Sequence, residues 1–464
     1  MAAAQASTME TILVGDIGGT NTRLVLFQVR RDDPQVRRPL KAGRKAPGLL
    51  LKQDKYLNQE YASFSAIITQ FLHEANLHKP PLTACFAVAG PVHNNSVTFT
   101  NRDAWKIDGR QLESQLGIAR VTLCNDFLAV GYGLLTLEVD AECEVLQHAP
   151  RQPGAPIACI GAGTGLGECF LTPSQVGGAT TTTTTTTTST SSSPSSLGNT
   201  GSSGDMASKL RGAEAPSYQY QYQCFASEGG HTDFSPRDEE QTAMVTYLKR
   251  KFGQDHRISV ERVVSGTGLA NIYEFLWSSA APDAEADGDA EAATAAAVVR
   301  AEVEAAGDLK GAIIAKHQHS DARCCRTMDI FAAAYGAEAG DAALKFLPFG
   351  GLFLTGGLTP KNMALLRPPQ GPFMRAFRDK GRLSGVLEGV PVFAVKAEDL
   401  GERGAHYLAF SHLQATLGLE EGAKVTGRRR AAALKWLSSL VLPISAAYVV
   451  TVVSVAAVVL WRRR

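Results

Sequence analysis

Two glycine-rich turns between apolar segments carry the clearest chemical signal in this sequence. The first spans residues 15–23, between the apolar runs 12–14 and 24–27, and contains Asp16 and adjacent glycines. Such glycines permit positive φ and let a ligand approach the main chain, and successive N–H groups in such a turn form a concave anion site. Asp16 adds a carboxylate that a metal-bound polyphosphate could use. Taken alone, this stretch is also compatible with an ordinary glycine hairpin.

The second turn, residues 161–167, repeats this arrangement. It follows the apolar segment 157–160 and precedes a further strand at 168–171. Two strand-turn-strand units, one in each half of the catalytic region, predict a duplicated fold whose halves face each other across a phosphate.

Polar residues also follow a predicted strand at 121–124, where Asn125 and Asp126 are succeeded by a helix at 128–137. Active sites of open α/β sheets gather at the carboxyl ends of strands. Asp126 could therefore act as a general base. It could equally cap the helix that begins at Phe127, and the residues alone leave both readings open.

The elements that must position these residues alternate between strand and helix, which predicts an α/β fold. The remaining expected helices are 63–75, 107–116, 239–251, 327–347 and one from about 401; the remaining expected strands are 84–89, 351–355 and 391–395, with a hairpin through Asn94-Asn95. A Thr/Ser-rich segment, 173–216, cannot bury a core and is predicted to be a disordered insertion. An Ala- and acid-rich segment, 280–308, is predicted to be a second insertion, partly helical and solvent-exposed.

Bulk properties narrow the class of protein. A chain of 464 residues exceeds one typical core, so two domains are expected. The net charge of +1 argues against a nucleic-acid-binding protein. None of the eight cysteines forms a C-x-x-C pair, which indicates reduced and mostly buried thiols. The first ten residues lack the pattern of a secretory signal.

The tail predicts a membrane anchor. Residues 436–461 are uncharged and predominantly apolar, enough for about 39 Å of helix at ~1.5 Å per residue. A basic linker, 419–435, precedes them. We expect a transmembrane helix that attaches a cytosolic catalytic domain to a lipid bilayer, at the mitochondrial or plastid outer membrane or the endoplasmic reticulum.

Eight motifs, in order, resemble those of the bacterial-type glucokinases of the sugar kinase/actin/Hsp70 superfamily. The motifs are 15–21, 86–91, 125–127, 161–167, 228–231, 261–263, 265–266 and 355–357. The resemblance covers residues 11–418 apart from the two insertions. It implies a two-domain, duplicated RNase H-like (actin-like ATPase) fold with a cleft between the lobes. The small α/β domain would be 9–136, completed by a helix at 400–418, and the large α/β domain 137–399.

The resemblance also implies an ATP-dependent glucokinase that transfers the γ-phosphoryl group to the C6 hydroxyl of glucose. Asp126 would be the base. The implied hexose ligands are Asn101, Asn125, Asp126, Glu228, His231 and Glu261. Without the family motif, His231 is better explained as a structural histidine, and Glu261 has an alternative as an ion-pair partner of Arg262.

For the nucleotide, the resemblance implies phosphate contacts from both turns and a nucleoside site beside two further glycines. The residues are Asp16, Gly18, Gly19, Thr20, Asn21, Gly163, Thr164, Gly165, Gly356 and Gly357. Asp16 would hold Mg²⁺ through water. No zinc is expected, because residues 232–236 lack the cysteine-rich motif of the related repressor and kinase group.

Two other functions remain open at this point. One is a kinase for another hexose: mannose, fructose or glucosamine. The other is a membrane-tethered sugar sensor without turnover. A homodimer is also compatible with the resemblance.

Overall fold

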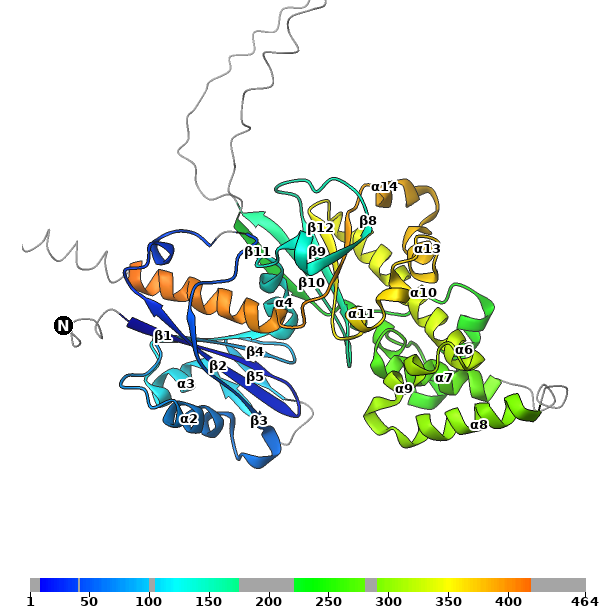
Figure 1. The fold of residues 1–464 in the computed structure, drawn as a ribbon, viewed down its shortest axis with the longest axis horizontal. Helices are drawn as coiled ribbons and strands as arrows, with labels where there is room; N and C mark the ends of the chain where they lie inside the picture. The colour runs from blue at the N-terminus through cyan, green and yellow to red at the C-terminus, as the bar shows by residue number, and fades with distance from the viewer. Residues whose placement is uncertain (1–8, 41, 100–104, 175–220, 280–289, 419–464) are drawn as a thin grey trace, which may run out of the picture. The chain divides into compact units, whose positions relative to one another are not determined.

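The computed structural model describes residues 9–40, 42–99, 105–174, 221–279 and 290–418 (Figure 1). The chain forms two compact units. Unit 1 comprises the residues up to Cys124 together with those from Ala405, and unit 2 comprises Asn125–Gly404. The division therefore falls immediately before Asn125 and Asp126, whereas the boundary proposed from the sequence lay at 136 and 137.

Unit 1 contains a five-stranded sheet of order β3-β2-β1-β4-β7. Its strands are β1 (Met9–Ile17), β2 (Asn21–Arg30), β3 (Leu49–Leu57), β4 (Thr83–Val88) and β7 (Arg120–Asn125). β1 pairs antiparallel with β2 and parallel with β4, and β2 pairs antiparallel with β3. A small ribbon of β5 (Ser96–Thr98) and β6 (Lys106–Asp108) follows β4. The predicted strands around the first turn are confirmed.

One face of this sheet is covered by α2 (Phe64–Glu74) and α3 (Gly109–Leu116). Ser63 caps α2, its Oγ accepting from Ala66 N at 3.2 Å. Gly117 ends α3 in the left-handed region, at φ 67°. Both helices confirm the sequence prediction, since side-chain N-caps and C-terminal glycines are typical helix boundaries. The short 3-10 helices of unit 1 are η1 (Pro34–Arg37) and η2 (Asn58–Glu60).

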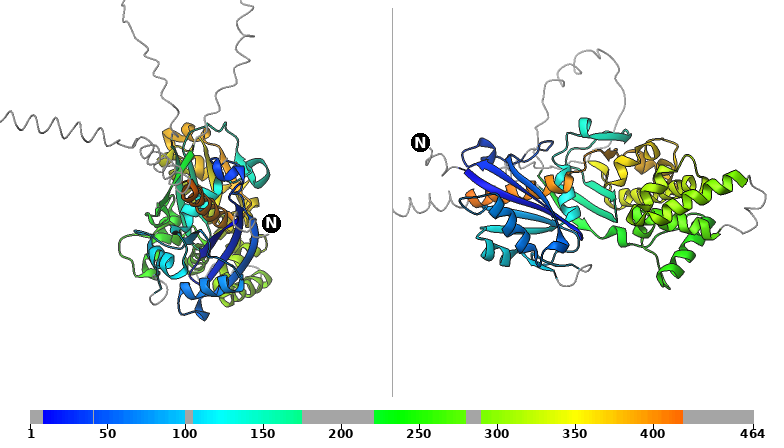
Figure 2. Two further views of the ribbon diagram at one scale, coloured as in Figure 1. Left: turned by 90° about the vertical axis from the view of Figure 1, so that its left-hand side faces the viewer. Right: turned by 60° about the horizontal axis from the view of Figure 1, so that its bottom comes forward.

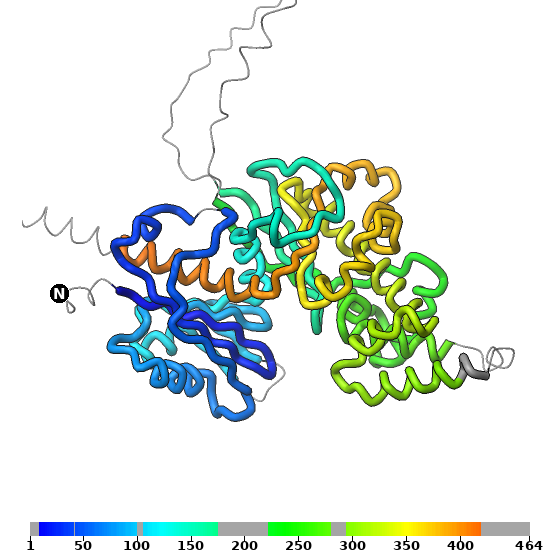
Figure 3. The backbone as a smooth tube through the Cα atoms, viewed as in Figure 1, coloured from blue at the N-terminus to red at the C-terminus, as the bar shows by residue number. Residues whose placement is uncertain are grey.

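The opposite face is covered by the helix at 400–418, which returns to the N-terminal sheet from the far end of the described chain (Figure 3). The His406 ring stacks on Phe27 with centroids 3.8 Å apart. Thr83 Oγ1 donates to Ala409 O at 3.0 Å. Burial lowers the pKa of His406 to about 3, so this histidine is neutral at physiological pH.

Unit 2 contains a six-stranded sheet of order β11-β10-β9-β12-β13-β8. Its strands are β8 (Cys143–Gln147), β9 (Ile157–Ala162), β10 (Leu166–Ser174), β11 (Gln221–Ser227), β12 (Gly351–Thr355) and β13 (Val392–Val395). β9 pairs antiparallel with β10 and parallel with β12, which repeats the relation of β1 to β2 and β4. The predicted duplicated α/β fold is therefore confirmed, with β8 as an additional antiparallel edge.

The helices of unit 2 pack on this sheet and on one another. They are α4 (Asp126–Leu134), α5 (Val139–Glu142), α6 (Glu239–Phe252), α7 (Gly266–Ser279), α8 (Ala290–Ala305), α9 (Lys310–Lys316), α10 (Ala322–Phe346), α11 (Leu358–Lys361), α12 (Met363–Leu366), α13 (Pro372–Arg378) and α14 (Ser384–Glu388). The 3-10 helices are η3 (Gly229–His231), η4 (Val260–Arg262), η6 (Gly307–Leu309) and η7 (Gly381–Leu383). Figures 1 and 2 show α6, α7, α8 and α9 gathered at one end of unit 2.

Two expectations about inserted segments need correction. β10 continues through Ser174 and pairs with β11, so the start of the segment predicted at 173–216 belongs to the sheet. α8 lies within the segment predicted to be solvent-exposed, yet it buries Val299 and Val303 in the core of unit 2. Their i, i+4 spacing puts both valines on one helix face. Residues 175–220 and 280–289 lie outside the described part of the chain.

The predicted transmembrane helix, 436–461, and its basic linker also lie outside the described residues. Among the helices that the structure does describe, none is both long and apolar enough to span a bilayer. The structure therefore gives the predicted anchor no support. The eight cysteines are free thiols, and all except Cys325 are buried, as expected.

Candidate active site

The first turn joins β1 to β2 through Gly18, Gly19 and Thr20. Gly18 N donates to Asn21 O at 2.9 Å and closes the turn. Contrary to the expectation of positive φ, neither glycine adopts that conformation. No atom lies within 4 Å of the position that a Cβ on Gly19 would occupy. What the glycine supplies is open space above the main chain, which a ligand can enter.

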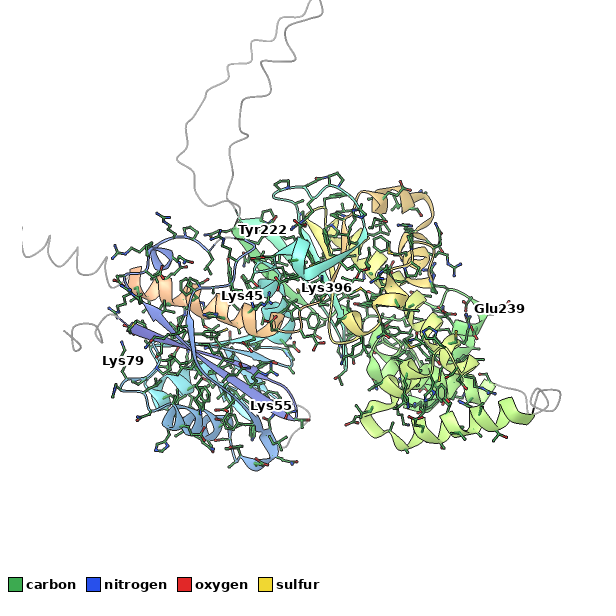
Figure 4. All side chains as sticks on the ribbon, viewed as in Figure 1. Lys45, Lys55, Lys79, Tyr222, Glu239 and Lys396 are labelled. Carbon is green, nitrogen blue, oxygen red and sulfur yellow. The ribbon has the colours of Figure 1, made fainter. Side chains whose placement is uncertain are left out.

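Asp16 lies in a row of charged residues beside this turn. It is the cross-strand partner of Arg23, which in turn pairs with Lys55 on β3, so the three exposed side chains lie on one face of the sheet, near its turn end. Figure 4 labels Lys55 at this end of the sheet. Loss of solvation raises the pKa of Asp16, and Arg23 partly offsets this. A carboxylate that water can reach, but that is poorly solvated, suits a hard hydrated cation such as Mg²⁺. Within the described residues, no group of three or more His, Cys, Asp or Glu side chains is arranged to hold a metal.

The second turn joins β9 to β10 through Gly163, Thr164 and Gly165. Gly163 N donates to Gly165 O at 2.8 Å. Gly163 O accepts from Gly266 N at 2.8 Å, which ties the turn to the start of α7. A Cβ on Gly165 would lie 2.4 Å from Glu261 Oε2, and this same oxygen accepts from Leu166 N at 2.9 Å. Glu261, a predicted sugar ligand, therefore also supports the second turn.

Asn125 and Asp126 stand where β7 ends and α4 begins. Asn125, rather than Asp126, caps the helix, because its Oδ1 accepts from Phe127 N at 2.9 Å and from Leu128 N at 3.2 Å. The alternative reading of Asp126 as the N-cap is therefore wrong. Asp126 is the first helical residue, and its own Oδ1 accepts from Phe127 N at 2.9 Å. That bond fixes the carboxylate at the carboxyl end of the strand.

Phe127 has a role that the sequence did not reveal. A Cβ on Gly167 would lie 2.0 Å from its ring, and a Cβ on Gly161 would lie 2.8 Å from it. The ring thus packs directly on the two strands that carry the second turn. The close packing holds Asp126 in a fixed relation to that turn, and it explains two glycines that turn geometry alone does not require.

The remaining predicted sugar ligands of unit 2 form a neighbouring group. His231 Nδ1 and Glu228 Oε2 are 3.5 Å apart, and both side chains are exposed. The segment that follows them pairs with residues before Glu261, since Val260 N donates to Thr232 O at 3.0 Å. A Cβ on Gly230 would lie 2.1 Å from Leu166 O, so this segment also lies against the base of β10. The structure therefore brings Glu228, His231 and Glu261 together beside the second turn.

A buried carboxyl pair lies beneath this group. Glu168, on β10, is 2% exposed, and its Oε2 would meet a Cβ on Gly229 at 2.0 Å. Burial, together with the neighbouring charge of Glu338, raises the pKa of Glu168 to about 8. The two carboxyl groups are close enough to interact electrostatically. Glu168 is therefore mostly protonated at neutral pH. No motif in the sequence indicates this pair, whose members lie far apart in the chain.

Gly356 and Gly357 follow β12, as predicted. Gly356 has a φ of +81°, and a Cβ there would lie 2.3 Å from Ala162 O, so the backbone requires glycine at this position. Nothing lies within 4 Å of a Cβ placed on Gly357. Gly356 is thus required by the conformation of its own turn, while Gly357 leaves open space beside the turn at 163–165.

Among the predicted site residues, those of unit 2 form one connected region. Asp16, Gly18, Gly19, Thr20 and Asn21 belong to unit 1, and Asn101 lies outside the described residues. The arrangement within unit 2 combines an anchored carboxylate, a glycine turn and the exposed side chains of Glu228 and His231. Such a set can accept a proton from a sugar hydroxyl beside a phosphate.

Comparison with known proteins identifies the family. The family model Glucokinase matches residues 13–191 and 213–412. The chain is 36% identical to a glucokinase of Synechocystis over 412 residues, which cover 85% of this chain and 96% of that enzyme. It is 35% identical to a glucokinase of Nostoc over 404 residues, which cover 86% of this chain and 98% of that enzyme. The chain belongs to the glucokinase family. The predicted activity, phosphorylation of glucose with ATP, is confirmed by these matches.

Solved glucokinase structures confirm the actin-like ATPase fold. A glucokinase from an Antarctic psychrotroph aligns with a TM-score of 0.57 at 22% identity, over 87% of this chain and 99% of that one. A glucokinase from Balamuthia mandrillaris, solved in complex with glucose, aligns with a TM-score of 0.60 at 20% identity, over 88% and 96%.

The glucokinase relatives also correct the predicted localisation. The expectation of a membrane-anchored enzyme at an organelle or endoplasmic reticulum membrane is wrong, because the kinase alignment accounts for 96% of the Synechocystis enzyme and 98% of the Nostoc enzyme. A lipid bilayer is accordingly withdrawn as a partner.

Proposed function

We propose that Asp126 is the general base of glucose phosphorylation and that Asn125, Glu228, His231 and Glu261 bind the sugar hydroxyls. Asn101 is proposed to line the same sugar site. The observation that supports this assignment is the position of Glu261, whose carboxylate lies against Gly165 and accepts from Leu166 N at 2.9 Å. A sugar bound by Glu261 would sit next to the turn proposed to hold the phosphates.

The reaction follows from these positions. The Asp126 carboxylate accepts the proton of the C6 hydroxyl while that oxygen forms a bond to the γ-phosphorus of ATP. The bond between the γ-phosphorus and the bridging oxygen breaks, and ADP leaves. Orientation of the hydroxyl and stabilisation of charge on the phosphoryl oxygens supply most of the acceleration in this class of reaction.

The nucleotide is proposed to contact both turns. Gly18, Gly19, Thr20 and Asn21 would donate to phosphate oxygens from unit 1, as Gly163, Thr164 and Gly165 would from unit 2. The open side of Gly357 and the turn at Gly356 would accommodate the nucleoside. Mg²⁺, held by Asp16 through water, would neutralise charge on the β- and γ-phosphates.

A sugar panel tests the assignment on the full chain. Glucose, mannose, fructose and glucosamine are offered with ATP and Mg²⁺, and ADP release is followed in a coupled assay. We expect kcat/KM to be highest for glucose. A higher value for another hexose would support the alternative kinase, and glucose binding without ATP consumption would support a sensor.

A further inference from the structure

Asn58 holds all three carbonyl groups of the first turn. Its side-chain Nδ2 donates to Gly18 O at 2.8 Å and to Gly19 O at 3.2 Å. Its backbone N–H donates to Thr20 O at 2.9 Å. Asn58 is 2% exposed and directly follows β3 as the first residue of η2. One buried residue on a different strand connection therefore fixes the whole turn.

The orientation of the Asn58 amide has no alternative. The carbonyl groups of Gly18 and Gly19 can only accept hydrogen bonds, so the NH₂ end must face them. The Oδ1 end accepts from Thr22 Oγ1 at 2.7 Å, and Thr22 is completely buried. Rotating the amide would place an oxygen against two carbonyl oxygens and leave buried groups unsatisfied, which is costly.

These bonds set the direction of the N–H groups of the turn. In a trans peptide unit the C=O of one residue and the N–H of the next point in opposite directions. The carbonyls of Gly18, Gly19 and Thr20 face Asn58, so the N–H groups of Gly19, Thr20 and Asn21 point away from it. The Cβ position of Gly19 meets open space. Successive N–H groups turned outward from a backbone form an anion site.

We propose that Asn58 is a positioning residue for the triphosphate of the nucleotide. It holds the carbonyl side of the first turn inward so that the N–H side meets phosphate oxygens. This inference rests on the proposed phosphate role of the first turn. A neutral amide suits the task, since a carboxylate at this position would repel both the turn carbonyls and the bound phosphates.

Kinetics of the full chain test the inference. We expect Asn58→Ala to raise the KM for ATP by about tenfold to a hundredfold and to change the KM for glucose by less than about twofold. Asn58→Asp should be at least as impaired, because it keeps the acceptor for Thr22 but loses both donors. Thr22→Val, which removes only the hydroxyl, should give a smaller rise in the KM for ATP. Thr22→Ser keeps the hydroxyl and should therefore have the wild-type KM for ATP.

Gln147→Ala is a matched control in unit 2. Gln147 is also a buried amide that donates to two carbonyls, those of Leu387 at 2.7 Å and Val390 at 2.9 Å. Its loss should lower Tm without raising the KM for ATP. If Asn58→Ala lowers Tm but leaves the KM for ATP unchanged, the inference is overturned. If Asn58→Ala does not fold, the KM for ATP of Thr22→Val is compared with that of Thr22→Ser. Equal values for these two variants would overturn the inference.

A Gly19→Val variant separates this inference from the assignment on which it rests. Valine would fill the open space over the turn and should raise the KM for ATP. If Gly19→Val raises that KM and neither Asn58→Ala nor Thr22→Val does, the inference alone fails. If none of the three variants changes it, the proposed phosphate role of the turn fails as well, while glucose phosphorylation by the wild-type chain still tests the function.

Discussion

The two glycine turns share length and strand order but are supported by different chemistry. Asn58, a neutral amide, holds the carbonyl groups of the first turn. Glu261, a carboxylate, accepts from Leu166 N, directly after the second turn. The buried pair of Glu168 and Glu338 is also close, because Glu168 lies on the same strand, β10. Duplication has therefore preserved the backbone path while the supporting side chains diverged. Carboxyl groups support the second turn, whereas the first turn rests on a neutral amide and a hydroxyl that do not titrate.

The glycines themselves differ in the same way. Gly19 faces open space, while Gly161, Gly165 and Gly167 lie against the side chains of Phe127 or Glu261. In the first turn glycine leaves room for a ligand. In the second, glycine leaves room for the protein's own side chains, those of Phe127 and Glu261. Substitutions at the first turn should therefore affect ATP alone, whereas substitutions at the second turn should affect the sugar and turnover as well as ATP.

The largest effect is expected at Asp126, which the packing of Phe127 holds beside the second turn. Asp126→Asn keeps the shape of the side chain but removes the proton acceptor, so kcat should fall by about 10²- to 10⁴-fold. Glucose binding, measured by calorimetry, should persist. Asp140→Asn, an exposed change on α5, is the control and should leave kcat unaltered. Near-normal turnover in Asp126→Asn would exclude it as the base.

A pair of identical substitutions should sharpen the contrast between the turns. Gly165→Ala places a methyl group 2.4 Å from Glu261 Oε2, so the carboxylate must move. We expect its KM for glucose to rise by about tenfold or more, since a misplaced buried contact costs on the order of 1–3 kcal/mol. Gly19→Ala should leave Tm and the KM for glucose unchanged and alter only the KM for ATP, by a few-fold. Equal effects of the two variants on glucose would contradict the comparison.

A smaller effect should appear in the pH dependence of stability. The pKa of Glu168 rises from 4.5 in the unfolded chain to about 8 in the folded protein, so the folded state binds an extra proton between these values. Its contribution to stability is complete below pH 4.5 and is lost as pH rises towards 8. Glu168→Gln should remove this slope, which amounts to at most about 1.4 kcal/mol per pH unit.

Denaturant unfolding at several pH values measures that slope. Asn58→Ala is the matched variant at the first turn, where the supporting network contains no ionisable group, and its slope should equal that of the wild type. A Glu168→Gln protein with an unchanged slope would show that the carboxyl pair does not link stability to pH.

Most of the fold could be predicted because its signals are local. Ser63 and Gly117 mark helix ends, and Asn94 and Asn95 adopt the positive φ values, 49° and 60°, that a tight hairpin needs. The two similar turns predicted that both sheets would contain the same arrangement of paired strands. The segment containing α8 was misjudged because alanine and acidic residues hide a short apolar stripe, whose burial depends on tertiary contacts.

The motifs of the site could be predicted from the sequence, but the residues that hold these motifs in place could not. Asp126 and Glu261 stand in recognisable local patterns, whereas Asn58, Phe127 and Glu338 act on residues distant in sequence. Nothing in the neighbourhood of Asn58 indicates that its amide will meet a turn some forty residues earlier. Glycine was also overinterpreted at the first turn, because the sequence cannot distinguish a need for positive φ from a need for empty space.

The helix at 400–418 gives unit 1 an unusual order of assembly. Its His406 ring covers Phe27, and the backbone of Ala409 accepts a hydrogen bond from Thr83, so the N-terminal sheet depends on a segment made after residues 125–404. During synthesis, residues 125–404 emerge complete while the earlier sheet still lacks one of its two layers. Unit 2 can therefore fold on the ribosome before unit 1 does, although unit 1 begins first, because domains fold as their chains become complete.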